Sequence, residues 1–94
     1  MNLCFVIGKI VSEIEFKFII NSKNISVAMF EIELSNKSII KVKGYNEIAD
    51  ICYQNLSKGE IVTIYGSLNN EMEIVINDIE AKNIVHMDFH IFFF

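Results

Sequence analysis

The first twenty residues alternate between apolar and polar side chains in the way that is typical of β-structure. Residues 3–11, LCFVIGKIV, are apolar and rich in strand-forming residues. Residues 13–20 alternate strictly, with Glu13, Glu15 and Lys17 on one face and Ile14, Phe16, Phe18 and Ile20 on the other. A period of two indicates a half-buried strand. Gly8 lies inside the first run, where glycine often marks a bulge or a sharp bend, so residues 3–20 are predicted to form one long, bent strand.

Two more strands follow from the same alternation. Residues 21–24 (NSKN) and 35–38 (SNKS) have the composition of tight turns. Between them, residues 25–34 form a strand that directs Phe30, Ile32 and Leu34 inward and Glu31 and Glu33 outward. Residues 38–45, SIIKVKGY, form the third strand, with Ile40 and Val42 on one face. Its other face carries Ile39, Lys41, Lys43 and Tyr45.

The hydrophobic period changes after residue 45. Apolar side chains then recur at helical spacing, at Ile48, Ile51, Cys52 and Leu56. Asn46 suits the N-cap, and Glu47 lies in the first turn, where a helix favours negative charge. Lys58 suits the C-terminal end of the helix dipole and Gly59 the left-handed position that follows a helix. These signals predict a helix of about three turns.

The period of two returns after residue 59. Residues 60–68, EIVTIYGSL, direct Val62, Ile64, Gly66 and Leu68 to one face, and the NN at 69–70 fits a two-residue hairpin. Residues 71–85 begin as a fifth strand, with Met72, Ile74 and Ile76 inward. Five strands with a helix between the third and the fourth are the arrangement of an OB-fold. We therefore predict an all-β OB-fold barrel over residues 1–85, followed by an apolar segment over residues 86–94.

The composition is that of one small domain. The chain has 94 residues, 52% of them hydrophobic, with no proline and four glycines, so a linker and a second domain are not expected. Met1 and Asn2 lead straight into an apolar strand without the features of a secretory signal. No apolar run reaches the roughly 18 residues of a membrane span. We expect a soluble cytoplasmic protein in which Cys4 and Cys52 are reduced core thiols.

The charge balance and the polar residues exclude several functional classes. Eight lysines and twelve acidic residues give a net charge of −4, which weighs against a dedicated nucleic-acid binder but allows a local basic stripe. His86 and His90 have a metal-ligand spacing on a helix, but only Asp88 accompanies them, on another helical face. No phosphate loop, catalytic triad or carboxylate pair stands out. Neither an enzyme nor a metal or cofactor is expected.

Four ordered segments resemble the bacterial single-stranded-DNA-binding (SSB) family. Residues 2–10, NLCFVIGKI, are similar to its opening N-x-V-x-L-x-G-x-L strand, and residues 27–34, VAMFEIEL, resemble its V-A-x-F-x-L-A strand. Residues 45–59, YNEIADICYQNLSKG, match F-[GN]-K-x-A-E-x-x-x-x-x-L-x-K-G without a gap, and residues 61–68, IVTIYGSL, resemble V-x-V-x-G-x-L. The resemblance implies a homodimer or homotetramer that binds single-stranded DNA, with replication proteins as possible partners.

The chain departs from the family on the surface that stacks bases. The family's aromatic residue near the helix is matched by Tyr45, its tryptophan six positions earlier is replaced by Ile39, and the basic residue between them is matched by Lys41. The hairpins that carry further aromatic residues in the family are cut to SNKS and NN. The family's acidic tail is replaced by HMDFHIFFF, so the resemblance does not extend to partner recruitment through that tail.

Strand parity and the resemblance together select a set of binding residues. Single-strand binding needs cations along the backbone and aromatic platforms for the bases. The competing interpretation of the lysines is ordinary cross-strand ion pairing with the outward glutamates, which are Glu31 and Glu33 on the neighbouring strand and Glu13 and Glu15 on the first. The candidate nucleic-acid-binding residues are Lys17, Ile39, Lys41, Lys43 and Tyr45.

Two functions stay open. The first is a single-stranded-DNA-binding protein of replication, recombination or repair. The second is an SSB-like protein-interaction or primosomal assembly subunit with weak or lost DNA binding. Tyr65 faces outward, off the surface of the second and third strands, and is interpreted as an interface residue. The four phenylalanines of residues 89–94 indicate an interaction site. Docking of this segment into a neighbouring subunit is favoured, with packing on its own barrel as the alternative.

Overall fold

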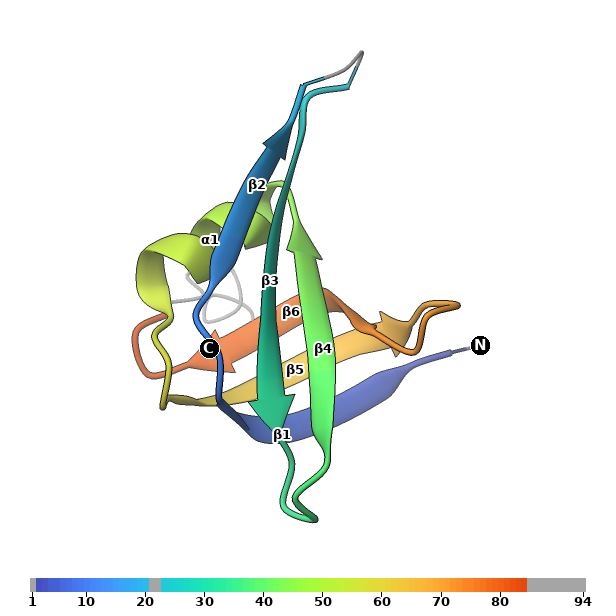
Figure 1. Ribbon diagram of the computed structural model, residues 1–94, viewed down its shortest axis with the longest axis vertical. Helices are drawn as coiled ribbons and strands as arrows, with labels where there is room; N and C mark the ends of the chain where they lie inside the picture. Colours follow the sequence, from blue (N-terminus) through green and yellow to red (C-terminus); the bar gives the residue numbers. More distant parts are fainter. Residues whose placement is uncertain (1, 21–22, 85–94) are drawn as a thin grey trace, which may run out of the picture.

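The computed structural model describes residues 2–20 and 23–84. The elements along the chain are β1 (Cys4–Ile10), β2 (Glu15–Ile19), β3 (Ile25–Glu33), β4 (Ile39–Tyr45), α1 (Glu47–Asn55), β5 (Ile61–Leu68) and β6 (Ile74–Ala81). The sheet has the order β1-β5-β6-β4-β3-β2, and an additional pairing of β1 with β3 closes it into a barrel (Figure 1). The predicted OB-fold barrel is confirmed, with the helix between β4 and β5. The first of its five strands is bent so strongly that it forms both β1 and β2.

The bend lies at Ser12 and not at Gly8. The Ser12 hydroxyl accepts the backbone N–H of Glu31 at 2.8 Å, in place of a strand carbonyl, and the chain turns from β1 into β2 there. Gly8 instead lies in regular pairing with β5. A Cβ at Gly8 would meet the carbonyl oxygen of Glu33 at 3.0 Å, so glycine fits here because β1 passes close to β3.

The core is filled by the inward faces that the period of two predicts. The helix adds Ala49 and Cys52, which are completely buried. Burial raises the pKa of Cys52 to about 12, so its thiol stays protonated. Both cysteines are free, although Cys4 is only partly buried. The buried strand residues include Ile10, Phe30, Ile32, Val42, Val62, Ile64, Ile74, Ile76 and Ile79.

The hairpin of β2 and β3 extends beyond the barrel (Figure 1). The strict alternation of β2 is present, and Phe16 packs against the core. Phe18 and Ile20, which share its face, are nevertheless exposed. The alternation therefore predicts the faces of this strand correctly, but burial stops where the barrel beneath the hairpin ends.

The helix α1 differs from the prediction at both ends. Asn46 has φ 55° and makes no side-chain cap; its N–H donates to the carbonyl of Ser26 at 2.9 Å and ties the helix start to β3. The helix ends at Asn55 after nine residues, about 2.5 turns. Lys58 and Gly59 lie beyond it, and Gly59, with φ 99°, belongs to the turn before β5. No helix in the described residues is long and apolar enough to cross a membrane.

The turn between β5 and β6 is longer than the predicted two residues. The N–H of Met72 donates to the carbonyl of Asn69 at 3.1 Å, and the N–H of Asn69 donates to the carbonyl of Glu73 at 2.9 Å. The Asn69 side-chain oxygen also accepts the N–H groups of Glu71 and Glu73, each at 2.9 Å. This is a type I turn followed by a left-handed residue, Met72, with φ 64°. Met72, predicted to point inward, is exposed because it belongs to this turn.

We expect Met72→Gly to raise the free energy of unfolding by about 0.5–1 kcal/mol. A left-handed backbone costs a residue with a Cβ roughly 1–2 kcal/mol, and the greater freedom of glycine in the unfolded chain offsets part of that gain. Chemical denaturation measures the change. Met72→Ala is the matched control, because it removes the side chain but keeps the Cβ, and it should give no stabilisation. Equal stabilisation by both variants would show that the exposed side chain, and not the backbone conformation, sets the effect.

Candidate nucleic-acid interface

The outer face of β2, β3 and β4 brings the predicted binding residues together. The four residues predicted on β4 lie along one line of that strand, and Lys17 lies on β2, two strands away from Tyr45 in the same row. The sequence-predicted set is therefore one surface. Its rows across the strands are Lys17–Val27–Tyr45, Glu15–Met29–Lys43, Glu31–Lys41 and Glu33–Ile39.

Tyr45 is the last residue of β4, and the chain turns into the helix directly after it. Its side chain is exposed, and its neighbour across the pair is the buried Val27. Asn46 holds this corner to β3 through its backbone N–H bond to Ser26, and the Ser26 N–H donates to the Asn46 side-chain oxygen at 3.4 Å. The strand end that carries the ring is thus fixed, which suits a stacking platform because little ordering remains to be done on binding.

Lys43 is engaged in an ion pair. Its Nζ lies 2.9 Å from Oε1 of Glu73, and both side chains are largely buried. The hydrogen bond to Glu73 raises the pKa of Lys43 above its usual value. The pKa of Glu73 is lowered, first by the hydrogen bond from Asn69 and then by that from Lys43. Lys43 is therefore a neutralised cation, and it is less available to a phosphate than its position on the face suggests.

Sequence reasoning missed this partner. Its competing interpretation paired the lysines with outward glutamates of the neighbouring strands, Glu31 and Glu33 among them. The register does set Glu31 opposite Lys41, but no ion pair joins them in the part of the chain that the structure describes. Glu73 reaches Lys43 because β4 also pairs, in parallel, with β6. The sequence pointed to this partner only through the position of Glu73 shortly after NN, in a turn that is longer than predicted.

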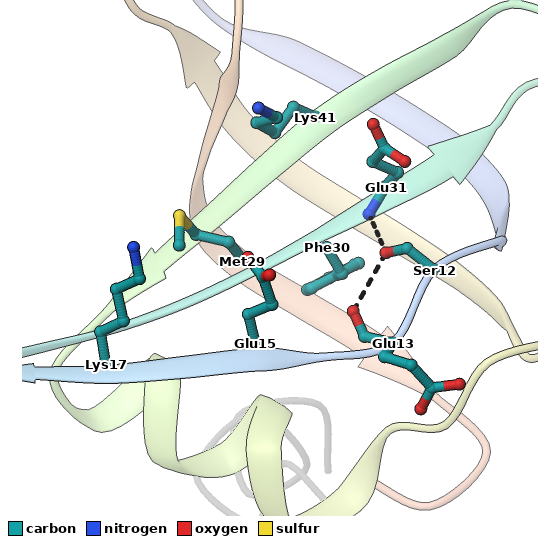
Figure 2. Close-up of a pocket in the computed structure, with 8 residues that line it drawn as sticks. All are labelled: Ser12, Glu13, Glu15, Lys17, Met29, Phe30, Glu31 and Lys41. Atoms are coloured by element: carbon teal, nitrogen blue, oxygen red, sulfur yellow. Dashed lines mark hydrogen bonds between the residues drawn. The ribbon is translucent and has the colours of Figure 1, made fainter.

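Lys17 and Lys41 are exposed and form no ion pair within residues 2–20 and 23–84. They line a surface cavity of about 480 Å³, and Figure 2 shows them on two sides of it with Met29 between them. Exposed cations that can follow a sugar–phosphate backbone are one of the two requirements of single-strand binding. The cavity is lined by Ser12, Glu13, Glu15, Lys17, Met29, Phe30, Glu31 and Lys41.

The carboxylates of the same cavity oppose this use. Glu13, Glu15 and Glu31 outnumber the two lysines, and the glutamates reduce the attraction for a phosphate. Ser12, which the sequence did not single out, closes this part of the cavity by donating to the Glu13 carbonyl at 3.0 Å and accepting from Glu31. The lysines and glutamates are interleaved on this face, with Glu31 directly opposite Lys41, so the cavity as a whole is not basic.

Some of the predicted features fall on residues 85–94, which lie outside the described residues. They are the His86 and His90 pair and the FHIFFF segment. Among residues 2–20 and 23–84, no group of three His, Cys, Asp or Glu side chains is placed to hold a metal ion.

Comparison at the level of sequence finds no relative, because neither a protein-family model nor a curated protein matches the chain. Comparison at the level of structure finds several. The SSB domain of a Synechococcus sp. protein superposes with a TM-score of 0.76 at 19% identity, over 85% of this chain and 94% of that domain. The single-stranded-DNA-binding protein of Thermus aquaticus gives 0.76 at 14% identity, over 92% of this chain and 42% of that one.

A third similar structure is the PriB protein of Ralstonia solanacearum, with a TM-score of 0.72 at 11% identity, over 86% of this chain and 98% of that one. Identities this low carry information about the fold. The resemblance predicted from the four sequence segments is confirmed at that level: the chain has the OB-fold of the SSB and PriB proteins.

Proposed function

We propose that this protein binds single-stranded DNA on the outer face of β2, β3 and β4, and that it acts in DNA replication, recombination or repair. The observation that carries the proposal is the placement of an exposed aromatic ring, Tyr45, on the same face as Lys17 and Lys41, which form no ion pair with any other described residue. Aromatic stacking combined with backbone cations is the general basis of single-strand binding, and OB-folds use this face for it. The fold shared with SSB proteins supports the proposal.

In this proposal each residue has one role. Tyr45 stacks a base, and Lys17 and Lys41 contact phosphates on either side of the cavity. Lys41 lies four residues from Tyr45 along β4, about 13 Å, so the site accommodates few nucleotides. Ile39 extends the face with an apolar contact. Lys43 contacts a phosphate only when its ion pair with Glu73 is broken. The surrounding glutamates make the binding weak, and the two phosphate contacts set its dependence on salt.

We expect Tyr45→Ala to weaken binding of a fluorescent oligo-dT by roughly 5- to 160-fold, because one stacked base is worth about 1–3 kcal/mol. Anisotropy titrations at low and moderate salt measure the change. Tyr45→Phe keeps the ring and should bind like the unmodified protein. The matched control is Tyr65→Ala, since Tyr65 is 39% exposed against 40% for Tyr45 but lies on β5, off the proposed surface. Absence of oligo-dT binding at low salt would contradict the proposed function itself.

We expect Glu73→Gln to strengthen oligo-dT binding several-fold, because it removes the charge that neutralises Lys43. The freed cation adds one phosphate contact, so the slope of log Kobs against log salt should steepen by about 0.7. The same anisotropy titration, repeated over a range of salt concentrations, gives the slope.

Glu71→Gln is the control for this change. It alters the net charge by the same amount in the same turn, but Glu71 forms no ion pair with Lys43. If Glu71→Gln and Glu73→Gln strengthen binding equally, the effect is one of total charge and the Lys43–Glu73 pair does not limit the site.

The second candidate function is an SSB-like protein-interaction or assembly subunit. The neutralised Lys43 and the three glutamates of the cavity favour it, because they weaken the face as a phosphate site. The likeness in fold to PriB is compatible with it as well. A homodimer or homotetramer and replication proteins as partners are part of the proposal for either function, and they rest on the resemblance to the SSB family alone.

A further inference from the structure

A second exposed surface lies on the outer face of β1 and β5, which are paired side by side (Figure 1). Five large apolar side chains are exposed there, and we call this set the apolar face: Leu3, Phe5, Ile7, Ile61 and Tyr65. The register joins them, with Phe5 opposite Tyr65 and their ring centroids 5.0 Å apart. Single exposed apolar residues are ordinary, but a contiguous group of this size on two neighbouring strands marks a surface that something covers.

The described chain ends at the end of the barrel where β5 begins. Ile84, the last described residue, is buried, and its N–H donates to the carbonyl of Ala81 at the end of β6. The side chain of Asn83 donates to Glu60 at 3.2 Å, and Glu60 directly precedes Ile61, the first member of the apolar face on β5. Ile84 therefore lies on the core side at the end of the barrel where β5, and with it the apolar face, begins.

The composition and length of residues 85–94 fit the apolar face. The sequence VHMDFHIFFF has seven large apolar residues of ten and one carboxylate, Asp88. The apolar face runs from Ile61, opposite Lys9, to Leu3, six residues along β1, or about 20 Å. Ten residues span up to about 33 Å when extended, which covers that distance. Lys9, exposed beside Ile61, supplies a cation for the one carboxylate of the segment.

We propose that residues 85–94 bind to the apolar face of their own barrel. Burial of phenylalanine side chains against Phe5, Ile7 and Ile61 supplies the driving force, because apolar surface leaves water on both partners. The short connection from Ile84 gives the segment a high effective concentration at its own apolar face, which favours this face over that of a second copy. The proposal is independent of nucleic-acid binding, since it uses other strands and other residues.

Fluorescence tests the proposal, because the chain contains no tryptophan and a single introduced one reports alone. Phe92→Trp places the reporter in the segment. Binding to the apolar face predicts emission shifted to short wavelength and weak quenching by acrylamide, both unchanged when the protein is diluted. Adding Ile7→Glu should shift the emission to long wavelength and raise the quenching constant several-fold, because a carboxylate then lies in the middle of the apolar face.

Ile39→Glu is the matched control in the same Phe92→Trp background. Ile39 is 56% exposed and Ile7 is 54% exposed, and both lie on outer strand faces, but Ile39 belongs to β4. It should leave the emission unchanged, and circular dichroism should show that both variants keep the fold. Emission typical of a solvated tryptophan, or an equal response to Ile7→Glu and Ile39→Glu, would overturn the proposal. A short-wavelength emission lost on dilution would also overturn it, because the segment would then bind between copies.

Discussion

The closed barrel depends on the pairing of β1 with two strands at once, β5 on one side and β3 on the other. Both pairings include Lys9, and beyond Ser12, whose hydroxyl accepts the backbone N–H of Glu31, the chain continues as β2 along β3 alone. This double pairing closes the sheet into a barrel. Closure turns one face of every strand into the core and leaves the other outside. The candidate interface is the outer side of β2, β3 and β4. Ser12, where the chain bends, lines the cavity on that side.

The charge of this interface is controlled from a neighbouring turn. Asn69 accepts two backbone N–H groups and donates its side-chain amide to Glu73 at 2.9 Å, so the carboxylate is held where Lys43 reaches it. The turn thereby decides how many lysines of β4 act as free cations. A net charge of −4 says little about this, because charges more than about 10 Å apart are largely screened at moderate salt. The local balance around Tyr45 determines whether a phosphate is attracted.

The sequence predicts the strand faces well because alternation is a local property. Lys41 and Tyr45 face outward, and the order of strands and helix is that of the OB-fold, as the spacing indicated. Contacts between β4 and β6 depend on which distant strands meet, and no local pattern contains that information. The Lys43–Glu73 pair was missed for this reason. Gly8 is a related case. A glycine within a strand indicates either a bend or a close approach of another strand, and the local sequence does not distinguish the two.

The end of the helix shows how packing overrides a local signal. Lys58 and Gly59 are suitable stop residues, yet the helix ends at Asn55 because Leu56 adopts an extended backbone and its side chain is buried. Packing of the core also separates the outer surface of β3 and β4 from that of β1 and β5. β3 and β4 cross in front of β1 and β5 with the core between them (Figure 1), so their outer faces point to opposite sides. Because the apolar side chains gather on β1 and β5 and the lysines on β2 and β4, a segment bound to the apolar face leaves the candidate interface open to a nucleic-acid strand.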